Sequence, residues 1–128
     1  MTTITLYRPV GTRELALIEA TGFRAFPPRL PEQPIFYPVT NQAYAIQIAR
    51  DWNTKQGDQI GFVTRFAVAA THLEKYERKI VGGRQHEEYW IPAEELDAFN
   101  AAIIGTIDVV GRYTEQDRLE HEKKLTHA

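Results

Sequence analysis

The segment from Pro27 to Pro34 constrains the fold more than any other part of the chain. It holds four of the seven prolines. Proline fixes φ and lacks the N–H donor that helices and inner strands need, so this segment forms neither. A proline-rich segment is stiff rather than flexible. We therefore expect a rigid loop, which suits either the wall of a cleft or a plain connection between two elements.

Alternating and periodic patterns lie on both sides of this loop. Thr3–Arg8 alternates as a strand that should end at Pro9, and Phe62–Val68 has the clearest strand pattern in the chain. The remaining expected elements are helices over 13–20 (N-cap Thr12, stop at Gly22) and 42–52 (cap Thr40 or Asn41), a helical turn over 71–75, strands over 23–26 and 101–110, and extended segments over 35–37 and 76–81.

The stretch from Gly82 to Pro92 combines a turn, a short apolar run and a helix start. Gly82 and Gly83 free the backbone, and Pro92 ends the run and is expected at the first position of a helix over 93–100. Glu88 then stands at the start of a strand that enters the body of the protein. Because acids are depleted in strands, Glu88 marks either a solvated edge or a site.

The order of these elements indicates an α+β fold. Strands and helices are mixed without a repeated strand–helix–strand rhythm, which argues against a doubly wound parallel sheet. The 128 residues suit one core. We expect a single domain over residues 1–112, followed by a polar C-terminal tail over residues 113–128 that is either helical or disordered.

Composition excludes several classes of function. The 15 Lys and Arg residues balance 17 Asp and Glu residues, so no nucleic-acid partner is expected. The chain lacks Cys and Ser, which removes thiolate nucleophiles, disulfides and serine triads. The four His residues lie far apart in the sequence, so no metal site is expected. No signal peptide or apolar run long enough for a membrane span is present, so we expect a cytoplasmic location and no membrane partner.

Three short motifs occur in an order that resembles a known family. They are Leu6–Gly11 (LYRPVG), Pro34–Val39 (PIFYPV) followed by Tyr44–Ala45, and Glu88–Pro92 (EYWIP). This order resembles the three signature regions of ADP-ribosyltransferase-like domains. Over about residues 4–110 the chain also looks like small bacterial proteins often labelled "ADP-ribosylation/crystallin J1". The hydrolase half of that label is rejected, because the Asp residues are not clustered and the chain is short for that fold.

The resemblance implies a split, mostly antiparallel sheet with flanking helices and a cleft for NAD. NAD would be the substrate, without a metal, and Glu88 would stabilise the positive charge that develops when the nicotinamide–ribose bond breaks. Arg8 would hold a ribose or pyrophosphate oxygen, Tyr37 or Tyr44 would pack on the nicotinamide, and Arg29 would meet phosphate. The catalytic candidates are thus Glu88, Arg8 and Tyr37, and the binding candidates are Arg8, Tyr37, Tyr44 and Arg29. They are expected to converge around one hollow.

Other interpretations stay open. Neither the Ser-Thr-Ser second motif nor the Glu-x-Glu spacing of arginine-modifying relatives is present, which favours a binding module that holds a nucleotide or a peptide without reaction. A third hypothesis is an interaction protein whose six Tyr, six Phe and two Trp residues build a core and a homo-oligomer surface. Arg8 in a structural ion pair is the plain alternative to Arg8 in a binding site.

Overall fold

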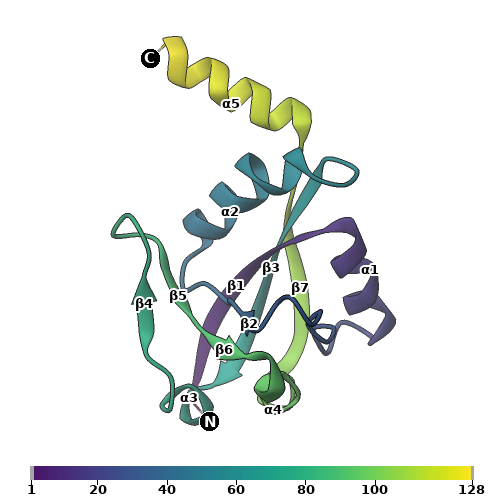
Figure 1. The fold of residues 1–128 in the computed structure, drawn as a ribbon, viewed down its shortest axis with the longest axis vertical. Coiled ribbons are helices and arrows are strands. Elements are labelled where there is room, and N and C mark those ends of the chain that lie inside the picture. Colours follow the sequence, from purple (N-terminus) through teal and green to yellow (C-terminus); the bar gives the residue numbers. More distant parts are fainter. Residues whose placement is uncertain (1, 128) are drawn as a thin grey trace.

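A three-stranded antiparallel sheet forms the centre of the protein (Figure 1). The structure, a computed structural model, describes residues 2–127. The sheet has the order β1-β3-β7, with β1 at Thr3–Gly11, β3 at Ile60–Ala69 and β7 at Ile103–Thr114. Two short antiparallel pairs accompany it: β2 (Ile35–Phe36) with β6 (Ile91–Pro92), and β4 (Arg78–Ile80) with β5 (Glu87–Tyr89).

Helices flank these sheets, which confirms the expected mixture of α and β structure with antiparallel pairing. They are α1 (Thr12–Ala20), α2 (Gln42–Asp51), α3 (Ala70–Leu73), α4 (Leu96–Ala101) and α5 (Glu115–His127), with short 3-10 turns η1 (Asn53–Lys55) and η2 (Ala93–Glu95). Helix α5 projects from the end of β7, at the C-terminal end of the chain (Figure 1). Within residues 2–127, none of the helices combines the length and the apolar character that a membrane crossing needs.

Alternation along the central strands gives the sheet two buried faces. Leu6 of β1 lies opposite Phe66 of β3, and both belong to the larger apolar cluster. Because successive side chains of a strand point to opposite faces, Val63 lies on the other face, in a smaller cluster with Ala45 and Ala49 of α2. The larger cluster also receives side chains from α1, β2, β6 and α4 (Ile18, Phe36, Ile91, Leu96 and Phe99). The two faces are therefore covered by different elements.

The backbone pairing of the central sheet continues beyond β1 through one residue, Val39. Tyr7 and Val39 exchange two backbone hydrogen bonds of 2.9 and 2.8 Å, and Val39 also bridges Glu88 of β5. Glu88 in turn lies opposite Lys79 of β4. Directly opposed residues of antiparallel strands place their side chains on the same face. Tyr7, Val39 and Glu88 therefore form a row on the α2 face, which fixes where the Glu88 carboxylate lies.

Helix α2 packs closely because its sheet-facing residues are small. Ala45 and Ala49 are one turn apart and fully buried. The Asn41 side chain caps the helix by accepting a hydrogen bond of 2.8 Å from the Tyr44 N–H, as the sequence predicted. At Gly61 of β3, a Cβ atom would approach the Ala49 carbonyl oxygen to 2.3 Å. A glycine at this position is thus what lets the helix backbone reach the strand.

Several predicted boundaries were wrong. Strand β1 continues through Pro9 to Gly11, because the Pro9 nitrogen points to the same outer side as the Tyr7 N–H and removes no bond to β3. Helix α1 already begins at Thr12, which therefore does not cap it, whereas Gly22 (φ +73°) ends the helix region as expected.

Residues 23–26 are not a strand, and Phe23 turns with φ +60°. Pro92 lies in β6 and precedes η2 instead of opening α4. Strand β7 runs four residues beyond the expected end, to Thr114.

Candidate functional site

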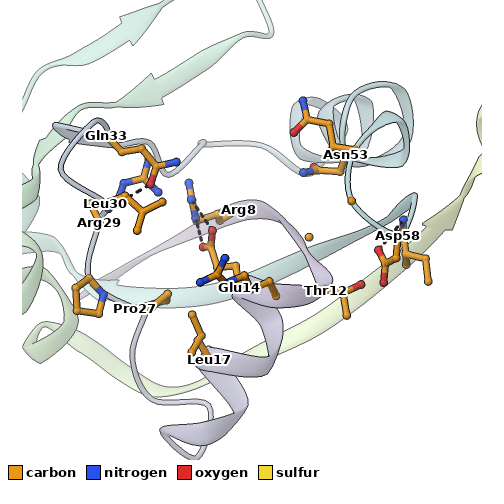
Figure 2. Close-up of a pocket in the computed structure, with 16 residues that line it drawn as sticks. Arg8, Thr12, Glu14, Leu17, Pro27, Arg29, Leu30, Gln33, Asn53 and Asp58 are labelled. Carbon is orange, nitrogen blue, oxygen red and sulfur yellow. Dashed lines mark hydrogen bonds and ion pairs between the residues drawn. The ribbon is translucent and has the colours of Figure 1, made fainter.

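A hollow of about 720 Å³ lies between the start of α1, the proline-rich loop and the turn that follows η1 (Figure 2). Of the five sequence-predicted site residues, Arg8 and Arg29 line it, and its lining does not include Tyr37, Tyr44 or Glu88. Pro27 and Pro28 form part of its wall. The proline-rich loop therefore lines a cavity, one of its two predicted roles.

Arg8 is buried at the base of this hollow and is already paired. Its Nε donates to Glu14 Oε2 at 2.7 Å and its Nη2 donates to Glu14 Oε1 at 2.9 Å. The guanidinium carbon lies 4.6 Å from the centroid of the Phe36 ring, a cation–π contact. The third nitrogen, Nη1, has only a long contact of 3.5 Å with the Tyr37 carbonyl oxygen. The structure thus gives Arg8 the structural ion pair that the sequence left open as its plain alternative.

Arg29 has no such carboxylate partner. Its Nε donates to the Ile35 carbonyl oxygen at 3.2 Å, and among the side chains that the structure describes no acid forms an ion pair with it. Burial of the guanidinium lowers the pKa of Arg29 from its usual value, and the nearby positive charge of Arg8 lowers it further. Figure 2 shows Arg29, Arg8 and Gln33 close together along one side of the hollow. The Glu14 carboxylate acts in the opposite direction on Arg29. A half-buried cation without a carboxylate partner of its own favours an anionic ligand.

Glu88 lies on the opposite face of the sheet from Arg8. The row Tyr7–Val39–Glu88 points toward α2, whereas Arg8 is the next residue after Tyr7 and points toward α1. Glu88 is only 7% exposed, so it is not a solvated edge residue. The structure therefore does not bring Arg8 and Glu88 together around one hollow.

Two side-chain donors hold the Glu88 carboxylate in place. The Tyr44 hydroxyl donates to Oε2 at 3.0 Å, and the Trp90 indole N–H donates to Oε1 at 2.8 Å. Burial, the charge of Glu88 and this hydrogen bond raise the pKa of Tyr44 to about 12. Trp90 was not among the predicted site residues. Its spacing of two residues from Glu88 could have identified it, because that spacing places both side chains on the same face of an extended segment.

Tyr37 and His86 border the Glu88 group. The Tyr37 ring meets the Trp90 ring edge to face, with 6.1 Å between centroids. The His86 ring stacks on Tyr44 at 4.5 Å and contacts the Gln47 amide oxygen and the Val81 carbonyl oxygen, each at 3.1 Å. Among the described residues, no three His, Asp or Glu side chains gather in a way that could hold a metal ion. Tyr44 and Glu88 thus form one group on the α2 face, while Arg8 and Arg29 form another beside α1. Tyr37 contacts the first group through Trp90 and the second through its carbonyl oxygen.

Several other residues that line the hollow were not predicted from the sequence. Glu14 neutralises Arg8, and Gln33 accepts a hydrogen bond of 3.3 Å from the Leu30 N–H. Leu17 and Leu30 contribute apolar surface to the wall although both are about half exposed. Nothing in the local pattern marks these residues, because their meeting depends on how α1 and the loop fold back over β1. No family model, no curated protein and no solved structure matches this chain.

Proposed function

We propose that the protein binds a phosphate-bearing nucleotide of the NAD or ADP-ribose class in the hollow between α1 and the proline-rich loop. The observation that carries this proposal is the half-buried Arg29 guanidinium, which lies beside Arg8 without a carboxylate of its own. A phosphate accepts two parallel hydrogen bonds from a guanidinium fork. Because Glu14 balances Arg8, the three charged groups carry one net positive charge, which a bound phosphate would offset.

The rest of the hollow suits the remainder of such a ligand. Leu17 and Leu30 provide exposed apolar surface along its wall, on which a base or nicotinamide ring can pack. Gln33 adds polar atoms beside Leu30, and Asp58 adds a carboxylate at the opposite end of the hollow (Figure 2). A volume of about 720 Å³ lies within the usual range for small-molecule sites. A binding module needs no catalytic group in this hollow, and Glu14 is already held by Arg8.

Calorimetry with ADP-ribose, NAD and adenosine tests this proposal. We expect ADP-ribose and NAD to bind and adenosine, which lacks phosphate, to bind much more weakly. Replacing Arg29 with Gln removes a charge-assisted contact, so affinity should fall by about tenfold or more. Arg24→Gln is the matched control, because exposed Arg24 does not line the hollow. If neither NAD nor ADP-ribose binds, or if Arg29→Gln binds them as well as the unmodified protein does, the proposal is contradicted.

A second candidate is NAD cleavage through Glu88. It is favoured by the way Tyr44 and Trp90 fix both carboxylate oxygens, since a positioned carboxylate can stabilise a sugar cation. On this hypothesis the reaction proceeds on the α2 face and without Arg8. Nicotinamide release from NAD should then occur with the unmodified protein and be lost in Glu88→Gln. Equal release by both proteins, or no release by either, would reject this candidate and leave the binding proposal standing.

A further inference from the structure

Two exposed aromatic rings form a corner on the surface above Glu88. Tyr37 is 39% exposed and Trp90 is 43% exposed. Their ring planes meet at 87°, with 6.1 Å between the centroids. Neither residue is part of the lining of the hollow beside α1. The corner therefore combines two partly exposed aromatic rings at nearly right angles, an arrangement that suits a cation.

The buried carboxylate strengthens this preference. Glu88 accepts the Trp90 indole N–H at 2.8 Å, and a donated hydrogen bond to an anion shifts electron density toward the indole ring. Among the described side chains, no Lys or Arg forms an ion pair with Glu88. Its negative charge therefore acts on whatever lies against the outer surface of Trp90.

The protein already places one of its own cations on this ring. The Lys79 Nζ lies 5.6 Å from the centroid of the Trp90 ring, and it also contacts Glu77 at 3.1 Å. Glu77 is largely exposed, so this contact holds Lys79 only weakly. The ammonium group of Lys79 shows which chemistry the ring accepts, and it can move away on a flexible side chain.

From these contacts we infer that Tyr37 and Trp90 form a recognition site for an alkylammonium group, with quaternary ammonium as the best ligand. A quaternary ammonium is weakly hydrated and leaves water for an aromatic surface more readily than the Lys79 ammonium does. Glu88 supplies negative charge at the Trp90 indole N–H, and Lys79 is displaced on binding. This site shares no lining residue with the proposed nucleotide site and takes a ligand of the opposite charge.

NMR titration of the Trp90 indole N–H tests the inference, because this group reports both on the ring and on its bond to Glu88. The experiment uses the variant Trp52→Phe, because this change removes the other indole, which is highly exposed. Choline is the ligand, and neohexanol, its uncharged carbon isostere, is the control. Sodium chloride at matched concentration corrects for ionic strength. We expect a saturable shift with choline, in the millimolar range, and little shift with neohexanol.

Two variants with the same change in charge sharpen the test. Lys79→Gln removes the competing cation and should raise the affinity for choline about two- to fivefold. Lys75→Gln removes a cation that lies 5.5 Å from the Tyr76 ring and should leave the affinity unchanged. Tyr37→Ala removes one of the two rings and should lower the affinity for choline about two- to fivefold. Equal shifts with choline and neohexanol, or no saturable shift in either the parent protein or Lys79→Gln, would overturn the inference.

Discussion

Tyr44 donates its hydroxyl hydrogen to the buried Glu88 carboxylate at 3.0 Å, which joins α2 to β5 across 44 residues of sequence. Val39 lies between β1 and β5 in the ladder and bridges Glu88, so the hydrogen bond and the backbone pairing act on the same residue. Removal of the hydroxyl leaves Glu88 Oε2 buried with one donor fewer. The Tyr44–Glu88 pair therefore contributes both to stability and to the orientation of the carboxylate.

The first prediction concerns Tyr44→Phe. At neutral pH we expect the free energy of unfolding to fall by about 1.5–3 kcal/mol, because a hydrogen bond to a charged group is lost. Urea denaturation measures this change. Tyr7→Phe is the control, since Tyr7 packs against the same cluster. An effect of equal size in both variants would show that the hydrogen bond to Glu88 adds nothing specific.

The second prediction concerns alkaline pH. The pKa of Tyr44 is raised from its ordinary value of 10.0 to about 12, so the folded protein favours the protonated hydroxyl. A raised pKa stabilises the fold below the ordinary pKa and loses this effect as pH passes through the raised value. The contribution of Tyr44 should therefore be complete below pH 10 and decline toward pH 12. Tyr44→Phe should weaken this part of the pH dependence in denaturation curves. If the stability of the unmodified protein and that of Tyr44→Phe depend on pH in the same way, this prediction is wrong.

The third prediction concerns the buried pair of Arg8 and Glu14. Glu14→Gln leaves the Arg8 guanidinium, 8% exposed, without its carboxylate, and we expect a loss of about 3 kcal/mol. The double variant Arg8→Met/Glu14→Gln should recover part of this loss, because no unpaired charge then remains. A double-mutant cycle by urea denaturation measures the coupling. Additive effects of the two single changes would mean that the ion pair is not a unit.

The fourth prediction concerns Gly61→Ala. The new Cβ would meet the Ala49 carbonyl oxygen at 2.3 Å, so α2 must move away from β3. We expect a loss of about 3 kcal/mol or more. Gly11→Ala is the matched control, because nothing lies within 4 Å of a Cβ at that position. Thermal denaturation compares the two variants, and similar melting temperatures would contradict the close packing of α2 on the sheet.

Local pattern predicted most of the elements but not the assembly of the site. The alternation of Phe62–Val68 and the helix cap are properties of neighbouring residues. The strand was predicted correctly, and the cap is Asn41, one of the two residues predicted for it. The face on which Glu88 lies depends instead on its pairing with Val39, which is 49 residues away in the sequence. A shift of one residue in this register would move the carboxylate to the Arg8 face. Sequence spacing alone could not decide between these two arrangements.

The proline-rich loop likewise has a local character that the sequence predicts and a position that depends on a distant contact. Its composition predicts stiffness, and the structure places it along the hollow. Its anchor is Asn100 of α4, which lies 74 residues from Phe26 in the sequence. No local pattern connects these residues, although their contact determines where the loop begins and hence where Arg29 lies.

The last prediction concerns this anchor. Asn100 Oδ1 accepts the Phe26 N–H at 2.9 Å, and Asn100 Nδ2 donates to the Phe26 carbonyl oxygen at 3.0 Å. Asn100→Ala leaves two half-buried backbone groups without partners, so we expect a loss of about 1–3 kcal/mol. Hydrogen exchange at the Phe26 amide should accelerate more than exchange in β3, because the loop opens locally before the sheet does.

Asn100→Ala should also weaken nucleotide binding, since a loosened loop no longer holds Arg29 beside Arg8. Asn100→Asp is the informative comparison, because it keeps the acceptor for the Phe26 N–H but loses the donor to the carbonyl oxygen. We expect intermediate exchange and intermediate affinity for ADP-ribose in calorimetry. If Asn100→Ala speeds exchange at Phe26 while ADP-ribose binds as before, the position of the loop does not control the hollow, and the ligand must rest on residues of α1 and β1 alone.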